Sequence, residues 1–299
     1  MVFAKVIEDN NFSHSSFLVA SCALDLIQMR YGVGNGEMAF HQFKHSFGVM
    51  QRAREIMKIF VSAGIANYAD LCLATIAAAC HDVVQEFEVV SKGEPGSDDA
   101  KYGRRVRKRK IGQNEEASAK FAVDAMRSYN AELGEEAFTD EYCAIVTQAI
   151  MGTIPAWNNT YRTMVQKALV PNCHPVVHAV LMADIGNAGI GKGNSWIVEG
   201  DQLLREEDFS LRELDFSKLD RSAEDYWRGV MLGWGKGQVS FAEGRRNRFE
   251  REIEWLPAEV QVGMQKLFCN FENSVSLQRS TNATREQMST YQLWKAMGF

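Results

Sequence analysis

The apolar residues of the chain recur mainly at helical spacing. From residue 49 onward they return every three or four positions, at Val49, Ala53, Ile56 and Phe60. This spacing predicts one buried stripe of an amphipathic helix. Residues 71–80 (LCLATIAAAC) are apolar on every face, and their alanines and leucines favour a short buried central helix over a strand.

Several polar residues mark where further helices begin. Asn114 and Thr139 each precede two acidic residues, which predicts an N-cap followed by a first turn that the helix dipole favours. His174 and Pro175 open another apolar segment, with the proline at a first position that a helix tolerates. Residues 222–225 fit a capping box at the start of a long helix.

Alternation with period two is rare, and clusters of β-branched residues are scarce, so we expect an all-α fold. Two segments interrupt the helical pattern. Residues 91–113 carry glycine, proline and dense charge, and they predict a long exposed loop. Residues 186–200 contain five glycines, which predicts a break in the chain after the helix that precedes them.

A glycine stripe is expected on the long helix near residue 230. Gly229, Gly233 and Gly237 are four residues apart, and each weakens a helix by about 1 kcal/mol relative to alanine. A compensating contact is therefore expected. Close approach of a second helix is the favoured interpretation, and a glycine-rich ligand contact is the alternative.

Composition and charge narrow the class of protein. Apolar residues make up 46% of the 299 residues and charged residues 24%, which is ordinary for a soluble globular protein. The net charge of −5 argues against general binding to nucleic acid or anionic membrane. Scattered cysteines, no signal-peptide pattern and no long apolar window predict a cytoplasmic protein with reduced thiols and no membrane span. The oligomeric state is left open.

The candidate chemistry lies in histidines and aspartates at buried positions. His41 and His45 are four residues apart, a spacing that stacks both imidazoles on the inward face of a helix. His81 and Asp82 close the apolar helix at 71–80, and Asp184 ends another apolar segment. Buried charge needs a partner or a metal. The mixed nitrogen and oxygen set suits zinc, manganese, cobalt, nickel or ferrous iron, and satisfied core polar groups are the alternative.

The motifs around these residues resemble the HD superfamily of metal-dependent phosphohydrolases. FHQFKHSFGVMQRA, AAACHDVV and LMADIGN follow its H…HD…D order, and the first segment is similar to the YHNxxHxxxV motif of cyclic nucleotide phosphodiesterases. HDVVQE…NEEASAKFA is similar to the HDxxY…NEExSA pattern of small bacterial predicted HD phosphohydrolases. The resemblance covers roughly residues 38–190.

The resemblance implies a role for each residue of the set. It implies that His45, His81, Asp82 and Asp184 are metal ligands. It also implies that His41 is the general acid that protonates the departing oxygen. A metal held in this way lowers the pKa of a coordinated water and polarises a phosphoryl oxygen, and an imidazole of ordinary pKa near 6.5 suits proton donation at neutral pH.

The expected architecture and reaction follow from the same resemblance. Residues 14–195 are expected to form the HD helical bundle, and residues 196–299 a C-terminal helical extension packed on it. The expected reaction is hydrolysis of a phosphate ester, with a nucleotide or another small phosphorylated metabolite as substrate. Fold analogy supplies the preference for phosphate, since the ligand set alone indicates only metal-assisted chemistry.

Departures from the family pattern affect the number of metal ions. Gln42 stands where the phosphodiesterases have asparagine, and no histidine lies between His81 and His174, where two-metal members supply further ligands. We therefore expect one strongly bound ion, with a second held weakly if at all. An HD-type iron oxygenase and a non-catalytic ligand-sensing HD protein are the alternative functions.

The acids and histidines outside this set have two interpretations each. Glu115 and Glu116 are first-turn acids worth about 0.3–1 kcal/mol each, or members of the NEExSA match that orient the water or support a ligand. Glu115 is the better candidate and joins His41 and Asp82 as a catalytic candidate. His174 and His178 are interpreted as a cap and a packed core residue, with lining of the pocket as the alternative.

A run of basic residues precedes Glu115. It contains Arg104, Arg105, Arg107, Lys108, Arg109 and Lys110. A solvated charged loop is the commoner explanation of such a run. Because arginine and lysine bind phosphate, the alternative is substrate capture, for which the candidate residues are Arg104, Arg105, Arg107 and Lys108. Nucleic-acid binding is less favoured, given the acidic remainder of the chain.

Overall fold

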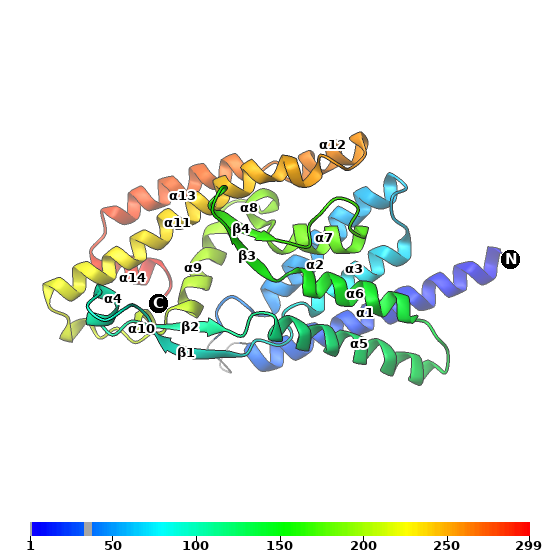
Figure 1. Cartoon of the computed structure of the whole chain (residues 1–299), viewed down its shortest axis with the longest axis horizontal. Coiled ribbons are helices and arrows are strands. Elements are labelled where there is room, and N and C mark those ends of the chain that lie inside the picture. The colour runs from blue at the N-terminus through cyan, green and yellow to red at the C-terminus, as the bar shows by residue number, and fades with distance from the viewer. Residues whose placement is uncertain (1, 33–37) are drawn as a thin grey trace.

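The chain folds mainly into helices, as the sequence predicts. A computed structural model describes the backbone of residues 2–32 and 38–299 and the side chains from residue 12 onward. The fold is all-α, with two small hairpins at its edge (Figure 1). The helices of the first two thirds are α1 (Val2–Tyr31), α2 (Phe43–Ser62), α3 (Tyr68–Cys80), α4 (Asp98–Lys101), α5 (Gln113–Leu133), α6 (Asp140–Gly152), α7 (Pro175–Asp184) and α8 (Asn187–Ile190).

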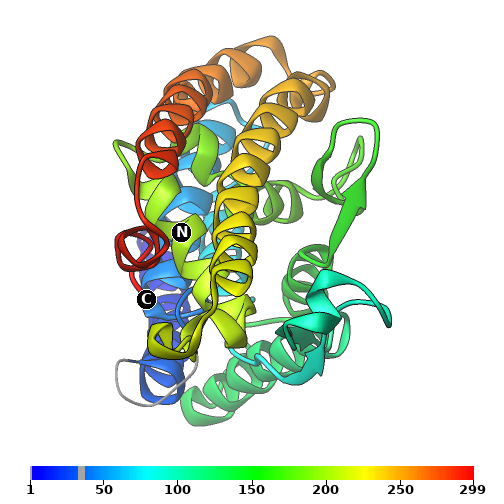
Figure 2. The ribbon, with the colours of Figure 1, turned by 90° about the vertical axis from the view of Figure 1, so that its left-hand side faces the viewer.

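The last third continues with helices that pack on this bundle. They are α9 (Ser195–Glu207), α10 (Phe209–Arg212), a 3₁₀ turn at Phe216–Lys218, α11 (Arg221–Ile253), α12 (Ala258–Leu267), α13 (Phe271–Glu286) and α14 (Thr290–Ala296). Long α11 runs beside α13 along one side of the molecule (Figures 1 and 2). None of the described helices combines the length and apolar character that crossing a membrane requires.

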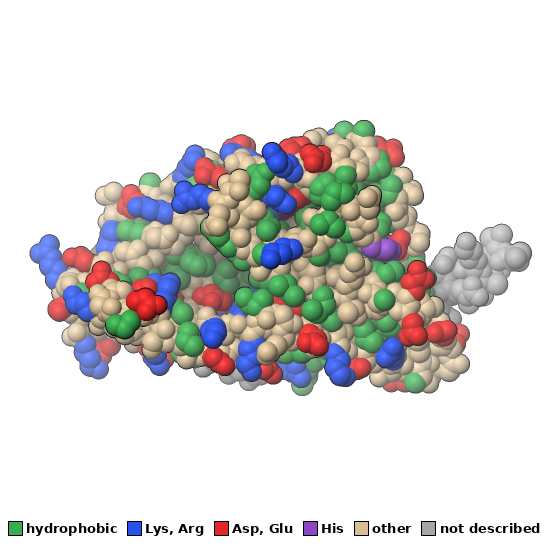
Figure 3. Space-filling model, viewed as in Figure 1, with side chains coloured by type: hydrophobic (Ala, Val, Ile, Leu, Met, Phe, Trp, Pro, Cys, Tyr) green, Lys and Arg blue, Asp and Glu red, His purple; other side chains and the backbone are tan. Residues whose placement is uncertain are grey.

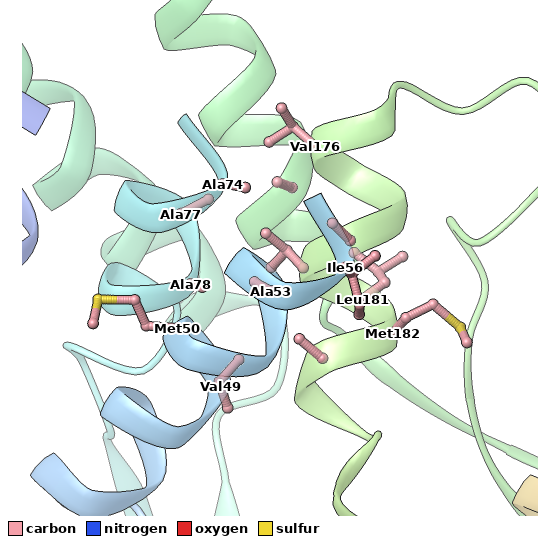
Figure 4. Close-up of a cluster of buried hydrophobic side chains, with 14 of the residues drawn as sticks. Val49, Met50, Ala53, Ile56, Ala74, Ala77, Ala78, Val176, Leu181 and Met182 are labelled. Carbon is pink, nitrogen blue, oxygen red and sulfur yellow. The ribbon is translucent and has the colours of Figure 1, made fainter. Parts of the chain in front are cut away.

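Three helices form the centre of the core. Buried apolar side chains of α2, α3 and α7 meet there (Figure 4). The predicted stripe at Val49, Ala53, Ile56 and Phe60 is confirmed, since none of the four is exposed to solvent. The predicted central helix is confirmed as well, because every residue from 71 to 80 is buried. The polar residues singled out by the sequence thus lie near the start of α2 and at the ends of α3 and α7.

The loop predicted over residues 91–113 is confirmed only in part, because a strand and a short helix interrupt it. Strand β1 (Phe87–Ser91) pairs antiparallel with β2 (Arg105–Arg109), and α4 lies between them. A second hairpin joins β3 (Pro155–Asn158) to β4 (Thr163–Gln166). In the sequence, the basic residues of this segment suggest exposure to solvent and so do not indicate a strand. In the fold, their charges pair instead with carboxylates of α9 and of the segment after it.

Helix starts agree with the sequence in part. The N-caps Thr139 and His174 are confirmed, as are Pro175 at the first turn and the break after α7. Asn114 is not an N-cap, because α5 already begins at Gln113, and its buried amide instead bonds the backbone N–H and C=O of Glu86. The capping box at residues 222–225 is wrong by two positions, since Asp220 caps α11.

The glycine stripe on α11 does not contact another helix. Gly229, Gly233 and Gly237 are exposed, and a methyl group added to any of them would meet no described atom within 4 Å. Close approach occurs instead at Gly244, where an added Cβ would lie 2.3 Å from the carbonyl oxygen of Tyr161. The expectation of helix packing at the stripe is therefore wrong, and the small residue that packing needs is one the spacing did not indicate.

Candidate metal centre

The ends of three core helices bring four side chains together. His45 lies in the first turn of α2, His81 and Asp82 follow α3 directly, and Asp184 is the last residue of α7. The Oδ2 atom of Asp82 is 3.4 Å from Nε2 of His45 and 3.0 Å from Nε2 of His81. Oδ1 of Asp184 is 3.7 Å and 3.5 Å from the same two nitrogens. All four predicted ligands thus face one small volume.

Neighbouring groups hold the outer atoms of three of these side chains. The backbone oxygen of Ala78 is 2.8 Å from Nδ1 of His81, which fixes that nitrogen as the donor. Gln85 donates to Oδ1 of Asp82 at 2.6 Å. Gln166 donates to Oδ2 of Asp184 at 2.7 Å. Each contact leaves the remaining atom of the side chain facing the centre, an arrangement typical of metal ligands and their supporting groups.

The electrostatics of this cluster are strongly coupled. Burial alone lowers the pKa of His81, but the Asp82 and Asp184 carboxylates outweigh it and raise this pKa well above its ordinary value. The pKa of His45 is raised by the same two carboxylates, against burial. Burial raises the pKa of Asp82, whereas the nearby imidazoles lower it well below the usual range. Protons therefore compete with any cation for the site.

The donor set fits a divalent metal ion. His45, His81 and Asp82 each offer a ligand atom within 4.8 Å of the others, and all three are buried. Nε2 of His81 is buried without a hydrogen-bond partner among the described residues, and a buried lone pair of this kind calls for a proton or a metal. Two imidazoles and two carboxylates suit a transition metal.

His41 reaches the same volume by a route other than the one predicted. It precedes α2, which begins at Phe43, so it does not share a helix face with His45. Its buried ring nevertheless lies 5.7 Å from the ring of His45, and its Nε2 is 3.8 Å from Oδ2 of Asp82. Burial and then the charge of Arg109 lower the pKa of His41 well below its ordinary value, contrary to the expectation of an ordinary pKa.

A buried glutamate that sequence reasoning missed holds His41. Glu206, near the end of α9, contacts Nδ1 of His41 and accepts hydrogen bonds of 2.9 Å from the backbone N–H groups of Phe40 and His41. The same carboxylate pairs with Arg107. The acidic sequence at residues 206–208 is the only signal for it, and nothing in that run points to a contact across 165 residues.

The position of Glu115 agrees with both of its interpretations, a first-turn acid of a helix and a residue close to the site. One carboxylate oxygen accepts from the backbone N–H of Gly112, which makes Glu115 part of the cap of α5. The other oxygen lies 3.7 Å from Nη2 of Arg109, and Arg109 lies at the same distance from Oδ1 of Asp82. Glu115 is buried beside the centre, with Arg109 between its carboxylate and that of Asp82.

The basic run does not form a single surface. Arg104 pairs with Asp208 and Asp99, and exposed Arg105 pairs with Glu213. The buried Arg107 joins Glu206, and Lys108 is exposed on the opposite side of β2. Their role in binding substrate stays a prediction. Of this run, Arg107 and Arg109 are the residues that the structure places beside the metal centre.

The two remaining candidate histidines lie away from the centre. His174 caps α7 at its far end, and His178 is buried between Phe60 and Trp255. Nε2 of His178 lies 3.0 Å from the backbone oxygen of Glu252. Both positions agree with a cap and a packed core residue.

The centre is open to solvent on one side. The side chains of Asp184 and Arg109 are 18% and 19% exposed. The surface is hollowed between the two hairpins, with hydrophobic and acidic side chains in its floor (Figure 3).

Comparison with family models, curated proteins and solved structures gives no match for this chain. The site is therefore interpreted from its own geometry.

Proposed function

We propose that this protein is a metal-dependent phosphohydrolase that uses one tightly bound divalent ion. The observation that carries the proposal is the convergence of His45, His81, Asp82 and Asp184, with their outer atoms held by neighbouring groups. Such an ion supplies an activated water and polarises a phosphoryl oxygen. The resemblance of the motifs to HD phosphohydrolases supports a phosphate ester, such as a nucleotide, as substrate.

In this proposal, His41 donates the proton and Glu206 orients the ring of His41. Because Glu206 contacts Nδ1, the other ring nitrogen of His41 is directed toward Asp82 and the centre. The Glu206 carboxylate against Nδ1 favours a proton on that nitrogen, whereas burial and then the charge of Arg109 lower the pKa of the ring well below its ordinary value. In its doubly protonated form, His41 would deliver the Nε2 proton to the departing oxygen and keep the proton on Nδ1, where Glu206 holds the ring in the required orientation.

Metal analysis together with a phosphatase screen tests the proposed function. Protein purified without chelator is expected to contain about one transition metal ion per chain and to hydrolyse at least one class of phosphate ester. His45→Ala is expected to lose the ion, while Lys44→Ala, an exposed neighbour on α2, retains it. Two irons per chain would favour the oxygenase, and a retained ion without any turnover would favour a ligand sensor.

A further inference from the structure

Three arginines on one face of β2 differ in what they contact. Alternation along a strand places Arg105, Arg107 and Arg109 on the same face. Arg105 pairs with Glu213, and Arg107 pairs with Glu206. Charge pairing at the start of this row therefore engages two of the guanidinium groups. Arg109 comes last in the row, at the end of the strand that lies beside the metal centre.

Arg109 has no comparable partner among the described residues. Its Nη2 atom lies 3.7 Å from Oδ1 of Asp82 and 3.7 Å from Oε1 of Glu115, beyond hydrogen-bond distance in both cases. Gln85 donates to the same Oδ1 of Asp82, whereas the N–H of Gly112 donates to Oε2 of Glu115 and leaves Oε1 facing Arg109. Nε of Arg109 is buried and makes no hydrogen bond. Nε of the paired Arg107 is unsatisfied in the same way, so the distinguishing feature of Arg109 is that its Nη2 lies beyond hydrogen-bond distance of both nearby carboxylates.

The position of Arg109 suits an anion held at the metal centre. Its side chain is 19% exposed, so solvent and ligands reach the guanidinium group. The planar group offers parallel N–H donors that match the spacing of phosphate oxygens. A phosphoryl group bound at the centre would lie beside both the metal ligands and Arg109.

We propose that Arg109 binds the non-bridging oxygens of the substrate's phosphoryl group. This inference rests on the proposed phosphohydrolase function and assigns to one residue the phosphate binding that the basic run suggested. Arg104, Arg105 and Arg107 are held by carboxylates of the chain itself, and Lys108 is on the other side of the strand. Arg109 keeps its donors available at the centre.

Binding of inorganic phosphate to the metal-loaded protein tests this assignment. Calorimetry would compare the wild type with Arg109→Gln, Arg109→Lys and the control Arg127→Gln, which removes an exposed arginine that pairs with Asp140. We expect Arg109→Gln to weaken phosphate binding about 10- to 100-fold, since charge-assisted hydrogen bonds are lost. Arg109→Lys should fall between, and Arg127→Gln should match the wild type. Metal content and melting temperature are measured for every variant.

The outcomes separate this inference from the function on which it rests. Equal phosphate affinity in Arg109→Gln and the wild type overturns the assignment of Arg109. A metal-loaded wild type that binds no phosphate at millimolar concentration also overturns it and leaves the metal centre standing. A wild type that takes up no metal overturns the proposed function. Even in that case, a loss of phosphate binding confined to the Arg109 variants would support an anion site at Arg109. If Arg109→Gln does not fold, Arg109→Lys decides the question.

Discussion

The orientation of the candidate site residues in this protein is set by the side chains that contact them. His41 lies outside the set of four candidate ligands, yet Glu206 directs its ring toward that set. The buried pair of Glu206 and Arg107 is costly to assemble, because both ions leave water. Removing one partner would leave the other as a buried, uncompensated charge. At the residue scale, the arrangement therefore links the proton donor to the hairpin strand β2.

Substitution of His41 should separate catalysis from metal binding. His41→Asn is expected to keep its metal and melting temperature and to lose about 10²–10⁴-fold in kcat, the usual effect of losing a general acid. The loss should shrink for a nitrophenyl ester, whose leaving group needs no proton. Steady-state kinetics and elemental analysis measure these effects. Full activity on an alkyl phosphate would place the acid elsewhere, and loss of metal would make His41 a ligand.

Glu206 is expected to act as a positioning residue. Glu206→Gln should lower kcat for an alkyl phosphate by about 10- to 100-fold, as changes to groups that support an active-site side chain commonly do. The decrease should be smaller for a nitrophenyl ester, because the contact serves proton donation. The control is Glu207→Gln, which removes the adjacent acid. An equal decrease for both esters would indicate a structural role alone.

Among the secondary-structure elements, the hairpin β1–β2 and helix α11 depart most from expectation. The hairpin is tied to α5 by the amide of Asn114, which bonds the backbone of Glu86 just before β1. Residues that indicate a helix cap in sequence thus connect two elements instead. Helix α11 carries its exposed glycines in its first half and its close contact at Gly244, about two turns beyond Gly237.

Replacing the exposed glycines of α11 should stabilise the protein. Gly229→Ala, Gly233→Ala and Gly237→Ala are each expected to raise the free energy of unfolding by about 0.5–1 kcal/mol, because alanine loses less backbone entropy in a helix. Gly244→Ala is the matched control and should destabilise the protein, since its Cβ would overlap the backbone of Tyr161. Chemical denaturation measures all four. A loss of stability at the exposed positions would indicate a partner on that face.

For the whole molecule, buried polar contacts connect the last third of the chain to the core. Arg245 and Glu252 of α11 form a buried pair of hydrogen bonds, and the backbone oxygen of Glu252 is bound by His178 of α7. Residues of α11, α12 and α13 contribute to the same hydrophobic cluster as the central helices. Glu206 reaches the centre from α9. The region after residue 195 thus supplies both packing and a side chain of the site.

The contact of His178 predicts how stability depends on pH. Burial lowers the pKa of His178 below its ordinary value, while its bond to the Glu252 backbone opposes this. Below about pH 6.5 the unfolded chain binds a proton that the folded protein refuses. The free energy of unfolding should therefore fall, by up to about 1.4 kcal/mol per pH unit, from pH 6.5 down to the lower folded-state pKa.

Comparison with His178→Gln isolates this effect. Glutamine does not titrate and can still donate to the backbone oxygen. In the presence of chelator, denaturant unfolding at pH 7.5 and pH 5.5 should show a larger loss of stability in the wild type than in the variant. The other histidines contribute equally to both proteins. Identical losses would contradict a lowered pKa at His178.

The sequence alone determined the features that depend on near neighbours. The stripe at Val49 to Phe60 and the buried helix at 71–80 follow from local spacing, because apolar side chains leave water on one or all faces of a helix. His45, His81, Asp82 and Asp184 could be selected because they lie at the ends of such segments and because their order resembles the H…HD…D pattern. When the apolar faces of these helices pack against one another, the polar residues at their ends are brought close together.

Tertiary structure decided what depends on contacts between distant segments. Glu206 meets His41 across 165 residues, and Arg109 comes beside Asp82 through the strand pairing of a segment that looked like a solvated loop. A charged residue has the same local signature whether it meets water or a buried countercharge. Its partner is fixed only when the chain folds, because burial of a charge is tolerated only where an opposite charge or a hydrogen bond compensates for lost water.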